Sequence, residues 1–135
     1  MSGIHLFLMS LWFHRDMKKI RCYKDLVVWQ KSVLLVEEVY SCTCKLPKLE
    51  GIGLVSQMQR ASVSISSNIA EGSERFDKKE WLFFLGVARG SCAELETQLQ
   101  LASKLYKYID FSKAVDLLAE VYKMLNRMTT RVLRG

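Results

Sequence analysis

The sequence contains few of the residues that interrupt regular secondary structure. Its 135 residues include one proline, Pro47, and seven glycines. A β-sandwich or a barrel needs turn residues about every 8–12 positions, and this chain does not supply them. A few long helices need few breaking residues, so the composition predicts an all-α fold.

Histidine is also scarce, and this limits the chemistry that the chain can perform. His5 and His14 are its two histidines, and both precede the helical part of the sequence. A di-iron bundle needs Glu-x-x-His pairs, so no such site can form there. No Ser-His or Cys-His pair and no glycine-rich phosphate loop is present either. We therefore expect neither enzymatic activity nor a bound metal or cofactor.

The four cysteines do not form a recognisable site. Cys42 and Cys44 are two positions apart, which suits neither a CxxC redox motif nor a zinc knuckle. Cys22 and Cys92 lie far from them in the sequence. Reduced thiols of this kind are typical of a cytoplasmic protein, which is the location we expect.

The first sixteen residues differ from the rest of the chain. Ile4 to Phe13 is apolar but shorter than the roughly 20 residues that a membrane-spanning helix needs. No positive stretch precedes it and no small-residue cleavage site follows it, so it is a poor signal peptide. We interpret 1–16 as an apolar leader or tail, with Met17 as an alternative start, and 17–135 as one domain. No membrane partner is expected.

Four segments repeat apolar residues at steps of three and four, which is the helical period. The short alternation ASVSIS suggests a strand, but it lies inside a much longer helical pattern. Four such helices with short connections predict an antiparallel up-down four-helix bundle. The expected segments are Tyr23–Lys45, Leu54–Glu74, Asp77–Lys107 and Phe111–Arg134. Their expected core stripes are Leu26, Trp29, Val33, Val36 and Tyr40; Leu54, Met58, Ala61, Ile65, Ile69 and Gly72; Trp81, Leu85, Ala88, Cys92, Leu95, Leu99, Ala102 and Tyr106; and Phe111, Val115, Leu118, Tyr122, Leu125, Thr129 and Val132.

The first and third segments carry more apolar surface than a single bundle needs. Exposed apolar stripes usually mark contacts with a partner, so we expect a homo-oligomer. Packing of the N-terminal segment against these stripes is the alternative. Gly86 and Gly90, four residues apart, indicate a further place for close helix contact. The expected interface residues are Val28, Leu35, Val39, Phe83, Val87, Leu101 and Leu105.

A set of polar residues falls beside the core stripes of the second and third segments. The simplest interpretation is a partly buried network that fixes helix register or the oligomer. An enzyme that uses Arg60, Glu71 and Glu96 is the less favoured alternative. The expected network consists of Gln57, Arg60, Ser64, Asn68, Glu71, Glu94 and Glu96.

The chain carries a net charge of +6, which favours an anionic partner such as nucleic acid. Four cations in the last segment fall at steps of four, four and three, opposite its core stripe. A charged outer face that complements the helix dipole is the alternative interpretation. The expected nucleic-acid contacts are Lys123, Arg127, Arg131 and Arg134, with a second cluster of Lys18, Lys19, Arg21 and Lys24.

Three motifs, in this order, resemble a known family. They are YKDLVVWQKS, LVSQMQRASVSISSNIAEGSER and KKEWLFFLGVARGSCAELETQLQLA. Together they are similar to the bacterial four-helix-bundle proteins encoded in intervening sequences of 23S ribosomal RNA genes. The accessory variability proteins of diversity-generating retroelements are related to that family. The resemblance covers about Tyr23 to Leu133.

The resemblance implies a four-helix subunit of a barrel-like homopentamer with no enzymatic activity. It also implies two functional hypotheses. In the first, the protein binds structured RNA or DNA through basic outer surfaces. In the second, it is a protein-interaction scaffold, an accessory subunit that docks a reverse transcriptase, as the retroelement proteins do.

Overall fold

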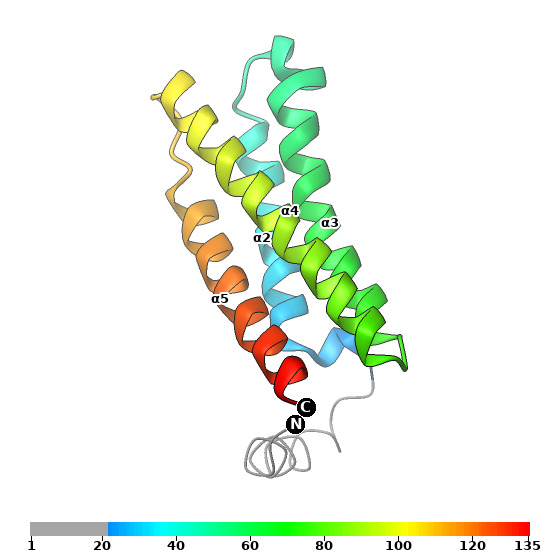
Figure 1. Cartoon of the computed structure of the whole chain (residues 1–135). Coiled ribbons are helices and arrows are strands. Elements are labelled where there is room, and N and C mark those ends of the chain that lie inside the picture. The colour runs from blue at the N-terminus through cyan, green and yellow to red at the C-terminus, as the bar shows by residue number, and fades with distance from the viewer. Residues whose placement is uncertain (1–21) are drawn as a thin grey trace.

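The structure is a computed structural model that describes residues 22–135 (Figure 1). The expectations for the leader, for Met17 as the start and for Lys18, Lys19 and Arg21 lie outside the described residues. Within them the chain is helical and contains no strand. Its elements are η1 (Tyr23–Asp25), α2 (Val27–Thr43), η2 (Lys48–Glu50), η3 (Gly51–Val55), α3 (Ser56–Ser73), α4 (Lys78–Leu105) and α5 (Ser112–Arg134).

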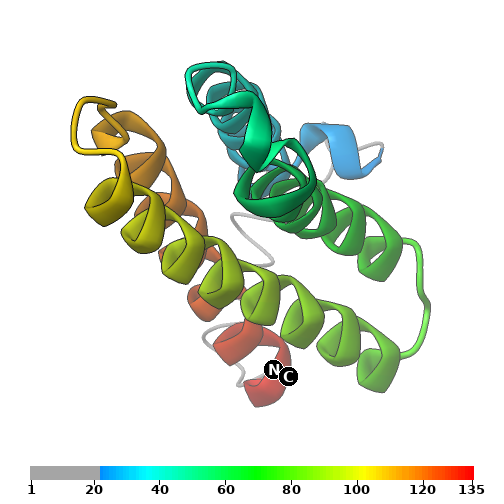
Figure 2. The ribbon, with the colours of Figure 1, turned by 90° about the horizontal axis from the view of Figure 1, so that it is seen from above.

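The four long helices form a bundle in which each helix packs along two others. α2 contacts α3 and α5, and α4 contacts the same two helices from the opposite side. In Figure 1 the colour runs upward along α2, downward along α3, upward along α4 and downward along α5. Seen from above in Figure 2, the four helices surround a common centre, which is where the buried side chains meet.

The helix ends follow local signals in the sequence. Asp77 precedes α4 with extended backbone, and its carboxylate accepts a hydrogen bond of 3.1 Å from the amide of Lys79. This is an N-cap, in which the donor is the amide two residues after Asp77. Between α2 and α3 the backbone of Gly53 leaves helical geometry, which produces the kink where η3 leads into α3.

The inner faces of α3 and α4 are those that the sequence predicts. Met58, Ile65 and Ile69 are fully buried from α3, and Leu85 and Leu95 are fully buried from α4. The many serines of α3 do not disturb its winding, because several hydroxyls donate to a carbonyl one turn earlier. These bonds run from Ser62 to Gln59, from Ser66 to Val63 and from Ser73 to Ala70, at 2.8–3.0 Å.

The predicted core stripe of α2 is wrong. The residues buried in the bundle are Val28, Ser32, Leu35, Val39 and Cys42, again at steps of three and four. This stripe includes all three α2 residues that the sequence analysis assigned to an oligomer interface. The predicted core residues Leu26, Trp29, Val33 and Val36 are half-buried instead, and Tyr40 is exposed.

The physical reason is that the first half of α2 is apolar on almost every side. Two phases of the helical period therefore fit the sequence equally well. Ser32 interrupts the true stripe, which made the other phase look more continuous. Its hydroxyl is fully buried but donates a hydrogen bond of 2.6 Å to the carbonyl of Trp29, so it can lie in the core without an unpaired donor.

The phase of α5 is also partly wrong. Leu118 and Leu125 are buried, as predicted, but Ala114 and Val121 complete the inner face. The predicted core residues Val115 and Tyr122 are exposed instead. A shift of one residue moves a side chain by about 100° around a helix, which is enough to take it from the core to the surface.

The predicted contact at Gly86 and Gly90 is also absent from the described chain, since both glycines are exposed and a Cβ atom at either would meet no other atom within 4 Å. The close approach of α3 to α4 occurs at Gly72. A Cβ atom there would lie 2.8 Å from Cβ of Phe84 and 2.9 Å from the ring of Trp81. Gly72 is therefore required by the packing of the bundle itself.

Candidate functional site

The outer face of α5 carries a line of cations, which we call the basic ridge: Lys123, Arg127, Arg131 and Arg134. Lys123, Arg127 and Arg134 are exposed, and Arg131 is half-buried. The ridge faces solvent because Leu118, Val121 and Leu125 occupy the opposite side of the same helix. Within residues 22–135, Lys123, Arg127 and Arg134 form no ion pair.

The first half of α5 has a different electrostatic character. Glu120 lies 3.4 Å from the ammonium group of Lys31, and Lys113 lies 3.5 Å from a carboxylate oxygen of Glu38. Both ion pairs join α5 to α2 and leave little net charge there. The uncompensated positive charge is therefore concentrated on the second half of α5, where it also complements the helix dipole.

The second expected cation cluster is described only at Lys24, which is exposed on η1. In Figure 1, η1 lies at the same end of the bundle as the C-terminus of α5. In Figure 2 the two segments lie on different sides of the bundle, so the view along the axis separates them. The structure does not join Lys24 to the basic ridge.

The expected polar network exists only in small part. The hydroxyls of Ser64 and Ser91 are 2.8 Å apart and link α3 to α4. The side-chain amide of Asn68 donates to the carbonyl and the hydroxyl of Ser64, at 2.7 and 3.1 Å. Ser91 was missed because the prediction took only the charged residues Glu94 and Glu96 from α4. Its position one residue before the core residue Cys92 is the signal that could have identified it.

The charged members of that network are surface residues, which corrects the prediction of partial burial. Among the described residues no hydrogen bond or ion pair connects them to one another. Arg60 lines an open hollow between α2 and α3, together with Tyr40 and Val63. The exposed members are Gln57, Arg60, Glu71, Glu94 and Glu96.

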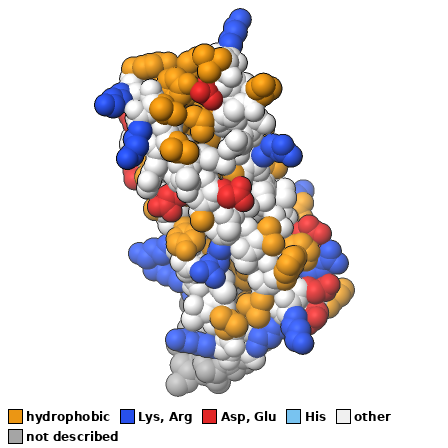
Figure 3. Space-filling model, turned by 45° about the horizontal axis from the view of Figure 1, so that its top comes forward, with side chains coloured by type: hydrophobic (Ala, Val, Ile, Leu, Met, Phe, Trp, Pro, Cys, Tyr) orange, Lys and Arg blue, Asp and Glu red, His pale blue; other side chains and the backbone are white. Residues whose placement is uncertain are grey.

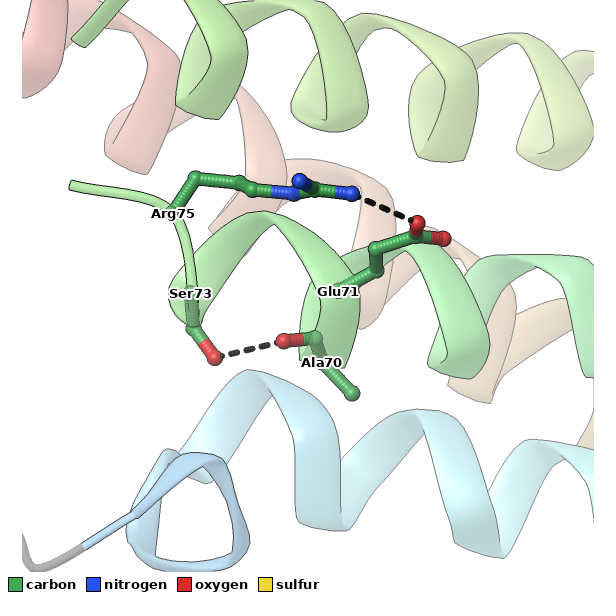
Figure 4. Close-up of polar contacts among 4 residues, drawn as sticks. All are labelled: Ala70, Glu71, Ser73 and Arg75. Carbon is green, nitrogen blue, oxygen red and sulfur yellow. Dashed lines mark hydrogen bonds and ion pairs between the residues drawn. The ribbon is translucent and has the colours of Figure 1, made fainter. Parts of the chain in front are cut away.

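Glu71 pairs with Arg75, a residue that the sequence analysis did not select. The guanidinium of Arg75 lies 3.0 Å from the Glu71 carboxylate, one helical turn away (Figure 4). It also lies over the ring of Phe84, 5.2 Å from the centroid. The four-residue spacing is the signal for the ion pair. Because both side chains are about half exposed, the pair contributes no more than about 0.5 kcal/mol.

The expected assembly residues divide into two groups. Val28, Leu35 and Val39 belong to the core of the subunit, so they cannot contact another chain. The α4 residues instead form an exposed apolar stripe. On α2, the exposed apolar residues are Val27, Leu34 and Tyr40. The α4 stripe consists of Phe83, Val87, Leu101 and Leu105.

Two serines of the described residues, Ser64 on α3 and Ser91 on α4, are bonded to each other through their hydroxyls. The hydroxyl of Ser64 also accepts a hydrogen bond from the side-chain amide of Asn68. No three His, Cys, Asp or Glu side chains of 22–135 lie close enough together to hold a metal ion. None of the helices in that range combines the length and apolarity that crossing a bilayer requires.

Comparison with models of known protein families gives a match over most of the chain. Residues 24–130 match the family model described as 23S rRNA-intervening sequence protein. The matched range runs from η1 to the last turns of α5 and contains all of α2, α3 and α4. A search of curated proteins finds no significant match to the chain.

Proposed function

Because the chain belongs to the family of 23S rRNA-intervening sequence proteins, we propose that it is a non-enzymatic protein that binds structured RNA or DNA. Contact is made through the basic ridge of α5. The observation that supports this proposal is the position of Lys123, Arg127 and Arg134, which are exposed and form no ion pair among the described residues. Such cations contribute most to the free energy of binding phosphate, because no ion pair within the protein must first be broken.

The ridge suits a folded or double-stranded nucleic acid better than an unstructured strand. Single strands are held largely by bases that stack on exposed aromatic rings. The exposed ring nearest in sequence, Tyr122, is one residue from Lys123 and therefore about 100° around the helix from it. The ridge thus presents charge without a stacking platform, so its affinity should be electrostatic and nearly independent of base sequence.

The test is a comparison of two triple variants in a salt series. In the ridge variant, Lys123, Arg127 and Arg134 become glutamine, while Arg131, which contacts other residues, is kept. In the control variant, the exposed Lys48, Lys78 and Lys79 become glutamine, which changes the net charge by the same amount.

We expect wild-type protein to retain duplex RNA or DNA at about 50 mM salt and to lose affinity steeply by about 200 mM. The ridge variant should bind weakly, with a salt slope reduced by about three, whereas the control should keep the slope. If wild-type protein retains no nucleic acid at low salt, or if both variants lose affinity equally, the ridge is only a solvated surface.

We further propose that this antiparallel bundle is the subunit of a barrel-like homopentamer, with the α4 stripe buried between subunits. Two pairs of large apolar side chains, Phe83 with Val87 and Leu101 with Leu105, are exposed on the same face of that helix, which is unusual for a surface that only meets water. Light scattering should give about five times the 15.6 kDa chain mass. Phe83→Glu should reduce this mass with little loss of helicity. A monomer at micromolar concentration would contradict the proposal.

The second candidate is a scaffold that docks a partner protein, as an accessory subunit of a reverse transcriptase in a retroelement. The same α4 stripe favours it, since the stripe could bind another protein as well as another copy. A reverse transcriptase encoded beside this chain is the partner to test. Co-purification that Leu101→Glu abolishes, together with no retention of nucleic acid, would favour the scaffold.

A further inference from the structure

One end of the bundle exposes large apolar side chains, although it is built mainly of connecting segments. This end, the loop tip, comprises residues 44–55, between α2 and α3, and 104–111, where α4 ends and leads into α5. Ile52 is 97% exposed, and Leu49, Leu105 and Tyr108 are each more than 60% exposed. Figure 3, in which this end is turned forward, shows hydrophobic side chains gathered over it. Clusters of this kind mark interaction sites, whereas single exposed apolar residues do not.

Lysines accompany these apolar side chains. Lys45, Lys48, Lys104 and Lys107 are all exposed, and none forms an ion pair with a described residue. Figure 3 shows Lys and Arg side chains around the edge of the apolar cluster. The loop tip therefore combines an apolar surface with unpaired positive charge.

The carboxylates of the loop tip are already engaged within the chain. Glu50 accepts hydrogen bonds from the hydroxyl of Tyr106 and from the amide of Leu54. Asp110 accepts a hydrogen bond of 2.9 Å from the amide of Ser112. Two carboxylates against four lysines leave the loop tip positive, which makes an anionic partner favourable.

The two halves of the loop tip are held together. The bond from Tyr106 to Glu50 joins the end of α4 to the connection between α2 and α3. The ring of Tyr106 also meets that of Tyr108 edge to face, with centroids 6.4 Å apart. Leu49 and Ile52 are therefore presented beside Leu105 and Tyr108 as one surface.

We propose that the loop tip docks on an anionic lipid bilayer. Leu49, Ile52 and Tyr108 insert among the headgroups, while the lysines contact the lipid phosphates. Lysine and tyrosine suit this boundary, because each has an apolar body and a polar end. Aliphatic side chains gain little from nucleic acid, whose bases stack on aromatic rings. Sequence analysis predicted no membrane partner because the apolar stretch Ile4 to Phe13 is too short to span a bilayer, whereas this contact is peripheral.

This inference is independent of the proposed contact between the basic ridge and nucleic acid. The basic ridge occupies the second half of α5, which ends at the opposite end of the bundle from the loop tip (Figure 1). Loss of one activity therefore need not affect the other.

The test is co-sedimentation of the full chain with vesicles at low salt. One set of vesicles is phosphatidylcholine alone, and the other is phosphatidylcholine mixed with phosphatidylglycerol. We expect binding to the mixed vesicles only. The double variant Leu49→Ser, Ile52→Ser should partition at least about tenfold less, because two apolar side chains no longer enter the bilayer. Lys45→Gln with Lys48→Gln should also weaken binding at least about tenfold, since each lysine near an anionic surface contributes about fivefold.

The matched control replaces apolar side chains outside the loop tip, with Phe76→Ser and Leu133→Ser. Both residues are exposed, so these changes leave the core intact. The control should bind mixed vesicles like wild type, and circular dichroism should confirm that every variant keeps its helicity.

Absence of wild-type binding to the mixed vesicles would overturn the proposal. So would unchanged binding by both loop-tip variants, or equal loss in the control. If the loop-tip variants lose retention of RNA while no chain binds vesicles, the loop tip contacts nucleic acid and the membrane proposal is wrong.

Discussion

The phenolic hydroxyl of Tyr106 donates a hydrogen bond of 2.5 Å to Oε1 of Glu50, a residue 56 positions earlier in the chain. The other carboxylate oxygen of Glu50 accepts a bond of 3.1 Å from the amide of Leu54. A Cβ atom on Gly53 would lie 2.7 Å from that oxygen, so a glycine leaves room for the carboxylate to turn back over the kink. One side chain thus closes a turn and ties it to α4.

The hydrogen bond between Tyr106 and Glu50 should make the stability of the connection between α2 and α3 depend on pH, both at low and at high pH. The bond from Tyr106, followed by that from Leu54, lowers the pKa of Glu50 below its ordinary value of 4.5. The contribution of this bond to stability is therefore complete above pH 4.5 and is lost as the pH falls through the lowered pKa of Glu50. The same bond raises the pKa of Tyr106 above 10.0, so the contribution is lost again as the pH rises through the raised pKa.

Removal of the hydroxyl by Tyr106→Phe should abolish the effect at high pH and reduce the effect at low pH, where the amide of Leu54 still bonds Glu50. We expect wild type to melt at a higher temperature than the variant between roughly pH 5 and pH 9, with the difference shrinking outside that range. Thermal unfolding followed by circular dichroism across this range is the measurement. A difference between the two proteins that does not change with pH would show that the bond contributes nothing through ionisation.

The register of α2 can be tested with two neighbouring leucines. Leu35 is 0% exposed and Leu34 is 47% exposed. Leu35→Ala should lower the free energy of unfolding by about 2–5 kcal/mol, because it leaves a cavity in the core. Leu34→Ala should change it by less than about 1 kcal/mol, since this side chain buries little surface within the subunit. Urea titration of both variants gives the comparison, and the reverse order would contradict the burial of Leu35 in the core of the subunit.

Gly72 and Gly90 provide a second pair of variants. Gly72 lies where α3 approaches α4 closely, whereas Gly90 has open space around it. Gly72→Ala should destabilise the bundle by about 1–3 kcal/mol, because its methyl group would overlap Phe84 and Trp81. Gly90→Ala has open space around it and should stabilise α4 by about 0.5–1 kcal/mol, since alanine favours a helix more than glycine does.

Thermal unfolding and light scattering should be measured on the same samples of both glycine variants. An unchanged melting temperature for Gly72→Ala would contradict the close approach. If Gly90→Ala reduces the assembly mass, another subunit must pack closely against that position.

The thiols should differ sharply in reactivity. Burial raises the pKa of Cys92 to about 12, and burial together with a hydrogen bond to Glu38 raises that of Cys42 to about 11. Since the thiolate is the reactive form, both should resist alkylation at about pH 8 in the folded protein. Cys44 is exposed and should react quickly.

Alkylation followed by mass spectrometry of peptides would assign each thiol, with protein in denaturant as the control. Cys42 and Cys92 should become reactive only there. Native-state labelling of Cys92 as fast as that of Cys44 would contradict its placement in the core.

The helical class, the approximate limits of the four helices and the inner faces of α3 and α4 could be predicted from the sequence. On α3 and α4 one phase of the helical period is apolar along the whole helix, with residues such as Ile65, Ile69, Leu95 and Leu99, so local pattern and burial agree. The basic ridge was predictable for the same reason, because its cations share the face opposite Leu118 and Leu125. The three motifs that identify the family were also present in the sequence itself.

Only the tertiary structure decided between patterns that the sequence allowed equally. The first half of α2 is apolar on almost every side, so the sequence alone does not show which side faces the core. The buried side is the one that packs against α3 and α5, and it carries Val28, Leu35 and Val39. The exposure of Arg60 and Glu71 also depends on packing. The spacing of residues along a helix does not give the distance between α3 and α4 at each point along the bundle. The bond between Glu50 and Tyr106 could not be predicted at all, since it joins segments that only the folded bundle brings together.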